Sequence, residues 1–337
     1  MQIGQLFILG FQGKVLPAWV KEFSARYGLG GVVLFDYCCQ KKQYDRNIDS
    51  PKQVHDLCVG ISALPTQPMV FIDQEGGLVR RLKENRGFRP LPSQKTLNLL
   101  SDEDKEKILF ASFKELSQLG IHYNFAPVID VDYNPKNPNI GAIQRAYSSV
   151  IAEVAANARL VSKIAEKTRI GLCLKHYPGI GGAHVDSHEE IMDLSTALYP
   201  EQEELFYKLA PHTFGNAIVV SHANIRQWDK KYPITLSSYA IKRIRRRLPD
   251  TLLISDDMQM QGLQKAMSTR DAALQSLLAG MDMICIGNNL LNEEQEMLDI
   301  VSNIERSISD NLLNIEDIKK AINRVIERKN LLIGIQK

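Results

Sequence analysis

Residues 251–257 read "TLLISDD", an apolar run that ends in two carboxylates. Leu252, Leu253 and Ile254 follow one another without the polar alternation of a half-exposed strand. Continuous apolarity over so short a run is typical of a β-strand that is buried on both faces, as in a parallel sheet. The polar residues Asp256 and Asp257 then stand where the strand would end. One such run does not decide a fold class. The recurrence of similar runs along the chain does.

Runs of the same length and character recur along the whole chain. They lie at 5–9 (QLFIL), 31–35 (GVVLF), 69–72 (MVFI), 122–128 (HYNFAPV), 171–175 (GLCLK), 217–221 (AIVVS) and 283–286 (MICI). Amphipathic helical segments separate most of them; segment 101–120 begins with the capping-box pattern Ser101-x-x-Asp104 and ends at Gly120. With 251–255 these make eight strands that alternate with helices. This pattern predicts an α/β fold, a single (β/α)8 TIM barrel over residues 1–337.

The composition narrows the possible partners and compartment. Lys and Arg (41) nearly balance Asp and Glu (39) for a formal charge of +2, so we expect no nucleic-acid partner and no anionic membrane. The start, MQIGQLFILGFQGK, lacks a basic region before its apolar run, and no apolar stretch approaches the roughly 20 residues of a membrane span. Five cysteines without C-x-x-C spacing indicate reduced thiols. We therefore expect a cytoplasmic monomer that acts on a small molecule.

Polar residues follow most of the predicted strands. They are Asp73, Gln74 and Glu75 after the third strand; Asp130 and Asp132 after the fourth; Lys175 and His176 on the fifth; Ser221 and His222 on the sixth; Asp256 and Asp257 on the seventh; and Asn288 and Asn289 after the eighth. Active sites of (β/α)8 barrels lie at the C-terminal ends of the strands, so these side chains should converge in one pocket. Carboxylates with a lysine, histidines and nearby arginines suit the hydroxyls of a neutral sugar better than a phosphate.

Cleavage of a glycosidic bond with retention needs one carboxylate at the anomeric carbon and one proton donor at the leaving oxygen. Asp256, at a strand end, suits the fixed role of nucleophile, because fixed groups belong on rigid elements. The stretch "KHYPGIGGAHVDSH" (175–188) offers the donor. Within it Asp186 stands two residues before His188, and a carboxylate can orient an imidazole for proton transfer.

Three other interpretations of this stretch remain open. A phosphate loop would need the G-x-x-x-x-G-K-[ST] spacing, which the glycines at 179–182 lack. A metal site could use His184, Asp186 and His188, although His222 is then the sole candidate ligand at another strand end. The stretch could also be a solvated loop without a role.

Several blocks together resemble glycoside hydrolase family 3, in its subgroup of bacterial β-N-acetylglucosaminidases (β-hexosaminidases). The blocks are FIDQEGGLVRRL (71–82), NFAPVIDVDYNPKNPNIG (124–141), KHYPGIGGAHVDSH (175–188), SHANI (221–225), TLSS (235–238), ISDDMQM (254–260) and AGMDMICIGNN (279–289). The resemblance runs in order along nearly the whole chain. It implies the barrel fold, a retaining two-step mechanism, and no metal or organic cofactor.

Residue roles also follow from this resemblance. It implies that Asp256 is the nucleophile and that Asp186 and His188 form the acid/base pair. The residues that it implies for sugar binding are Asp73, Arg81, Arg145, Lys175 and His176. Members of the subgroup are cytoplasmic exo-enzymes that remove terminal GlcNAc from peptidoglycan-derived muropeptides during cell-wall recycling, and we expect the same here.

Two departures from the family pattern keep alternatives open. Ile180 stands where the family's K-H-F-P-G-H-G has its second histidine, and the segment before Arg145 is two residues longer than the usual I-G-D-R-S-F. The alternatives are a β-glucosidase or phosphorolytic β-glycosidase of the same family, a sugar-binding barrel without catalysis, and a metallohydrolase.

Overall fold

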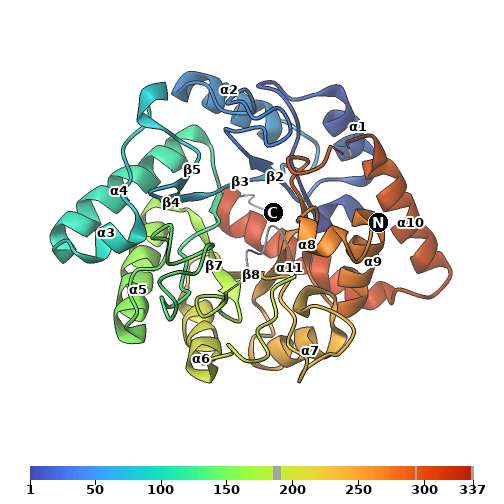
Figure 1. Cartoon of the computed structure of the whole chain (residues 1–337). Helices are drawn as coiled ribbons and strands as arrows, with labels where there is room; N and C mark the ends of the chain where they lie inside the picture. Colours follow the sequence, from blue (N-terminus) through green and yellow to red (C-terminus); the bar gives the residue numbers. More distant parts are fainter. Residues whose placement is uncertain (185–190, 293, 335–337) are drawn as a thin grey trace.

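The computed structural model describes residues 1–184, 191–292 and 294–334. Within these residues eight parallel strands close into a barrel in the order β1-β10-β9-β8-β7-β6-β3-β2, and helices surround it (Figure 1). Each strand therefore pairs with the barrel strand before and after it in the chain, as in a (β/α)8 barrel. The predicted fold class is confirmed.

The barrel strands are β1 (Phe7–Leu9), β2 (Gly31–Leu34), β3 (Met69–Ile72), β6 (Tyr123–Asn124), β7 (Gly171–Tyr177), β8 (Ala217–Val220), β9 (Leu252–Asp257) and β10 (Met283–Ile286). A small hairpin, β4 (Gln74–Gly76) and β5 (Val79–Arg80), follows β3. The helices are α1 (Ala18–Tyr27), α2 (Pro51–Ser62), α3 (Gln94–Asn98), α4 (Asp102–Leu119), α5 (Ile151–Thr168), α6 (Pro200–Leu209), α7 (Ser238–Arg247), α8 (Gln261–Gln264), α9 (Thr269–Ala279), α10 (Met297–Ser309) and α11 (Ile315–Ile333). None of these helices combines the length and apolarity needed to cross a membrane.

The ends of the elements follow local chemistry. Ser101 caps α4 by accepting a hydrogen bond from the backbone N–H of Asp104 (3.1 Å), and Gly120 ends the helix with a φ of 82°. The run 122–128 is strand only at Tyr123–Asn124. Pro127 has no N–H for the ladder, so the chain leaves the sheet before it. The strand that the apolar run predicts is therefore longer than the observed one.

Charged side chains at the strand ends face into the barrel. The alternation of side chains along β3 leads from Phe71, inside the barrel, to Asp73 at its mouth. On β7 and β9 the pairing is irregular between Leu174 and Tyr177 and between Ile254 and Asp257, yet Lys175 and Asp256 line the same cavity. Three different strands thus deliver charged side chains to one mouth of the barrel.

Helix α11 covers the opposite end of the barrel. Its Val325 and Leu332 join the interior cluster, and α11 passes behind the strands in Figure 1. Buried Lys329 donates to the Gln5 Oε1 (2.5 Å), the Leu29 carbonyl (2.8 Å) and the Thr66 carbonyl (2.9 Å). These contacts fix α11 to loops at the N-terminal ends of the strands, so a ligand reaches the barrel from the other mouth.

Candidate active site

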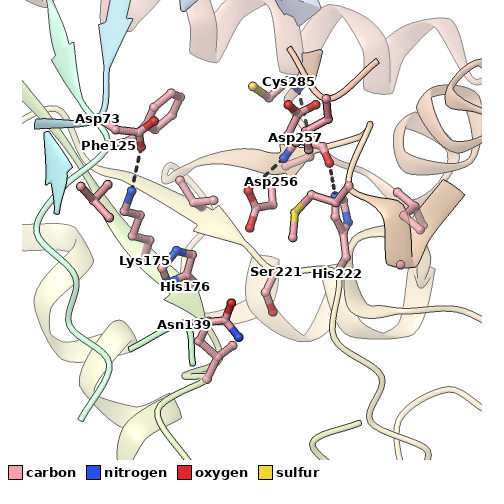
Figure 2. Close-up of a pocket in the computed structure, with 18 of the residues that line it drawn as sticks. Asp73, Phe125, Asn139, Lys175, His176, Ser221, His222, Asp256, Asp257 and Cys285 are labelled. Carbon is pink, nitrogen blue, oxygen red and sulfur yellow. Dashed lines mark hydrogen bonds and ion pairs between the residues drawn. The ribbon is translucent and has the colours of Figure 1, made fainter. Parts of the chain in front are cut away.

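A cavity of about 410 Å³ lies at the C-terminal ends of the strands. This size is within the range of small-molecule sites. Figure 2 shows Asp73 and Lys175 on one side of the cavity and Asp256 and His222 on the other. Of the residues that the sequence predicted for the site, the cavity is lined by Asp73, Arg81, Arg145, Lys175, His176 and Asp256. The other two, Asp186 and His188, lie outside the described residues.

Lys175 is the centre of a buried charge network. Its Nζ lies 2.9 Å from Asp73 Oδ1 and 2.6 Å from Glu75 Oε1. Arg145 binds Glu75 with two hydrogen bonds, both 2.8 Å long, and Arg81 lies 3.0 Å from Asp73 Oδ2. Three cations therefore surround two carboxylates here, and Asp130 and Asp36 are further anions that act on Arg145 and Arg81 respectively.

This network fixes the protonation state of its members. Burial opposes ionisation of Asp73, but Lys175 and Arg81 outweigh it and hold the pKa of Asp73 well below its usual value. Burial likewise opposes ionisation of Glu75, yet Arg145 and Lys175 lower the pKa of Glu75 to about 2. Burial would lower the pKa of Lys175, but the two carboxylates raise it. All three groups are therefore charged near neutral pH and can bind sugar hydroxyls as fixed donors and acceptors.

The longer segment before Arg145 is accommodated by a local loop. The backbone N–H of Arg145 donates to the carbonyl of Ile140 (3.0 Å), which leaves residues 142–144 looped outward. The Arg145 side chain also donates to the Asn139 carbonyl (2.8 Å) and lies 3.1 Å from His176 Nε2. The two extra residues thus do not remove Arg145 from the cavity.

Asp130 organises the first part of the stretch that follows β7. It is fully buried and accepts hydrogen bonds from the His176 backbone N–H (3.1 Å) and the Ile180 backbone N–H (2.8 Å). It also lies 2.7 Å from His176 Nδ1. This contact assigns the proton of neutral His176 to Nδ1, so Nε2 can accept from Arg145. Ile180 stands where the family motif has its second histidine; it is buried and lines the cavity.

Replacing Asp130 by asparagine should therefore disturb His176 without removing any charge from the cavity wall. An amide cannot accept from three donors as a carboxylate does, so we expect the His176 ring to lose its fixed orientation. For a GlcNAc glycoside we expect kcat/KM to fall about 10- to 100-fold, because a small misplacement of a group that positions the substrate is costly. Steady-state kinetics check this, with Asp310→Asn at an exposed position as the control; an unchanged kcat/KM in Asp130→Asn would contradict the assigned role.

Asp256 and its neighbour Asp257 have different surroundings. Asp257 Oδ1 accepts from the backbone N–H groups of Gln259 (3.0 Å) and Gly287 (3.2 Å). Burial raises the pKa of Asp257 to about 6, although these two backbone hydrogen bonds lower it. Both residues line the cavity, and Asp256 Oδ1 accepts from the Asp257 backbone N–H (2.9 Å). Because two backbone donors hold Asp257 Oδ1 while one holds Asp256 Oδ1, Asp256 is the more available carboxylate of the pair for a substrate.

His222 holds the end of β9 in place. Its Nε2 lies 3.1 Å from the Asp257 carbonyl and its Nδ1 lies 2.7 Å from Thr235 Oγ1. A carbonyl can only accept, so Nε2 carries the proton and Nδ1 accepts from the hydroxyl. Burial lowers the pKa of His222 and outweighs the nearby Asp256 carboxylate, which raises it. The ring is therefore neutral at pH 7. The sequence predicted His222 as a strand-end residue of the pocket, and the structure adds its contacts with Thr235 and Asp257.

Two other residues of the site were not predicted as such from the sequence. Glu75 was noted as a strand-end residue, and its pairing with Arg145 joins positions 70 residues apart. Phe35, at the end of β2, lies against Arg81, with its ring centroid 5.4 Å from the guanidinium carbon. Within residues 1–184, 191–292 and 294–334, no three His, Cys, Asp or Glu side chains are grouped to hold a metal ion. The candidate ligands Asp186 and His188 fall outside these ranges.

Comparisons with known proteins agree with this geometry. A beta-hexosaminidase from Nitrosospira multiformis is 30% identical over 310 residues, which cover 88% of this chain and 84% of that protein. A beta-hexosaminidase from Idiomarina loihiensis is 28% identical over 299 residues, which cover 84% of this chain and 83% of that protein.

The fold also matches a solved structure, that of a glycoside hydrolase family 3 beta-N-acetylglucosaminidase from Paenibacillus sp. str. FPU-7. The TM-score is 0.85 at 24% identity, and the match covers 100% of this chain and 63% of that protein. Residues 2–327 match the Glycosyl hydrolase family 3 N terminal domain. This chain therefore belongs to glycosyl hydrolase family 3 and is a glycoside hydrolase.

Proposed function

We propose that this protein is a retaining exo-β-N-acetylglucosaminidase with Asp256 as its nucleophile. The observation that carries the proposal is the position of Asp256, which faces into the same cavity as the Asp73, Lys175 and Arg145 network. The beta-hexosaminidase relatives support GlcNAc as the sugar that is released.

In the proposed first step the sugar hydroxyls bind the charged network, and Asp256 attacks the anomeric carbon. The bond to the leaving oxygen breaks while His188, oriented by Asp186, protonates that oxygen. In the second step His188 takes a proton from water, the water oxygen attacks the anomeric carbon, and the bond to Asp256 breaks. GlcNAc leaves with its β configuration retained.

The finer parts of the proposal concern the substrate and the setting. We propose that the GlcNAc is the terminal sugar of peptidoglycan-derived muropeptides and that residues 1–337 act as one catalytic domain, a monomer in the cytoplasm. The proposed roles of Asp73, Arg81, Arg145, Lys175 and His176 are to bind the hydroxyl and acetamido groups of this sugar. Their shared cavity supports this assignment.

The test is release of 4-nitrophenol from its β-GlcNAc and β-glucoside conjugates by the purified protein. We expect kcat/KM to be about 100-fold or more higher for the GlcNAc conjugate, because polar groups arranged for the acetamido group are left unpaired by glucose. Repeating the assay with added phosphate separates hydrolysis from phosphorolysis, which would yield GlcNAc-1-phosphate. Equal rates on both conjugates would instead favour a β-glucosidase, and binding of GlcNAc without turnover would favour a sugar-binding barrel.

A further inference from the structure

A buried glutamine on the outer helix α6 reaches the segment that carries Asp130. Gln202 is 1% exposed and is not among the described residues that line the cavity. Helix α6 lies beside β7 on the outside of the barrel (Figure 1). Gln202 Nε2 donates to the Ile129 carbonyl (3.0 Å), and its Oε1 accepts from the Val131 backbone N–H (2.7 Å). One side chain therefore binds the backbone on both sides of Asp130.

These two hydrogen bonds fix the backbone conformation of Asp130. The Ile129 carbonyl belongs to the peptide group before the Asp130 Cα, and the Val131 N–H belongs to the peptide group after it. Because peptide groups are planar, holding both of them sets φ and ψ of Asp130 and with them the direction of its side chain. Strand β6 ends at Asn124, so the barrel ladder does not hold Asp130 in this way.

Gln202 also contacts the backbone of the stretch that follows β7. Gly179 has a φ of 116°, and a Cβ there would lie 1.9 Å from Gln202 Cγ. A Cβ at Gly181 would lie 1.8 Å from the Val131 carbonyl oxygen. The two glycines thus allow a close approach to Gln202 and Val131 that any other residue would prevent. The amide of Gln202 is therefore packed between the two segments that meet at the Asp130 carboxylate.

We infer that Gln202 is a positioning residue for His176 and that it acts through Asp130. The Asp130 carboxylate lies 2.7 Å from His176 Nδ1 and accepts from the His176 backbone N–H, so its direction decides how the imidazole faces the cavity. A helix on the outside of the barrel thereby sets the orientation of a ring inside it. The inference rests on the proposed function in one respect, that His176 binds the sugar.

The first test replaces Gln202 by leucine, which keeps most of the volume and removes both hydrogen bonds. We expect kcat/KM for 4-nitrophenyl β-GlcNAc to fall about tenfold, because a shift of the His176 ring by a fraction of an ångström spoils its fit to the sugar. Gln53→Leu is the matched control. Gln53 on α2 accepts from the Asp49 backbone N–H (2.9 Å) and donates to the Lys14 carbonyl (2.8 Å), and it is not among the described residues that line the cavity. Its kcat/KM should equal that of the wild type.

A double-mutant cycle separates positioning through Asp130 from general damage. Residues that act through one another have effects on kcat/KM that do not multiply. Once Asp130→Asn has released the His176 ring, the further change Gln202→Leu should therefore cost less than about twofold. Losses that multiply in the double variant would overturn the inference.

Gln202→Glu gives a second variant in case the leucine variant does not fold. A protonated carboxyl can donate and accept as the amide does, whereas a carboxylate can only accept and would face the Ile129 carbonyl and Asp130. Burial favours the protonated form. We therefore expect kcat/KM, relative to the wild type at the same pH, to recover as the pH falls from about 8 to about 5.5. A loss that is independent of pH would contradict the assigned hydrogen bonds.

The His176 ring gives a readout that does not depend on turnover. In protein with nitrogen-15-labelled histidine, the two-bond proton–nitrogen signals of His176, identified by their absence in His176→Gln, report which ring nitrogen carries the proton. We expect the Nδ1–H tautomer in the wild type and a mixture of tautomers in Gln202→Leu. The same tautomer in both proteins would overturn the inference. If the wild type cleaves neither the β-GlcNAc nor the β-glucoside conjugate, the proposed function fails, and this measurement still decides whether Gln202 positions His176.

Discussion

Replacing Asp256 by alanine is expected to lower kcat for 4-nitrophenyl β-GlcNAc by about 10⁴-fold, which corresponds to roughly 5.5 kcal/mol of transition-state stabilisation. Without this carboxylate no covalent intermediate can form, and the oxocarbenium-like transition state loses the anion nearest to it. The fold should be unaffected, because the described hydrogen bond to the Asp256 carboxylate comes from the neighbouring Asp257 backbone. Steady-state kinetics and a thermal melt of the same sample measure both effects.

Azide distinguishes loss of the nucleophile from general damage to the site. In Asp256→Ala a small anion can enter the space of the carboxylate and attack the anomeric carbon from that side, giving the α-GlcNAc azide. In His188→Ala the glycosyl-enzyme still forms with a good leaving group, so azide attack on it gives the β-GlcNAc azide. Opposite anomers from the two variants are expected; the same anomer from both would contradict the assigned roles.

The second large effect is expected on stability, from Lys175→Met. Lys175 lies between Asp73 and Glu75 and is almost fully buried, so its removal leaves two carboxylates with less positive charge nearby. Breaking a buried ion pair from one side typically costs about 3–5 kcal/mol. We expect the free energy of unfolding in urea to fall by that amount at pH 7. Lys167→Met is the control, because Lys167 and Glu106 form an exposed pair whose loss should change stability by less than about 0.5 kcal/mol.

The pH dependence of this loss has a definite sign. The pKa values of Asp73 and Glu75 are lowered in the folded protein, so their contribution to stability is present above their unfolded pKa values, near 4. It is lost as the pH falls from 4 through the folded pKa values. Without Lys175 these pKa values rise, so the deficit of the variant should be largest at pH 7 and should shrink as the pH falls below about 4 towards the folded pKa values of the wild type. A deficit that stays constant from pH 7 down to about pH 2.5 would mean that Lys175 acts by packing rather than by charge.

The parts of the fold that depend on local pattern could be predicted from the sequence. Buried parallel strands are continuously apolar, so the eight runs predicted the barrel, and the position of Asp73, Lys175 and Asp256 at the C-terminal ends of strands explains why they meet. The boundaries were less certain where a run continues past the sheet, as at Pro127.

The partners within the site could not be predicted in the same way. Asp130 lies in the irregular segment after β6, where no periodicity indicates which way a side chain points. The pairing of Glu75 with Arg145 depends on how residues 142–144 loop outward, and that conformation is set by the hydrogen bond from Arg145 to Ile140. The sequence showed the two extra residues, but it did not show that Arg145 and Ile143 both line the cavity.

The helix that covers the base of the barrel has a consequence for synthesis on the ribosome. Val325, Lys329 and Leu332 are synthesised after all eight barrel strands, yet they contact β-strand side chains and loops made from residues 1–66. Until α11 has left the exit tunnel, the apolar core between the strands has no cover on that side. Domains usually fold as units once their chain is available, and exposed apolar surface makes the incomplete ones prone to aggregate. The nascent barrel therefore depends on α11 to complete its folding, and a pause in translation before residue 315 would prolong the exposed state.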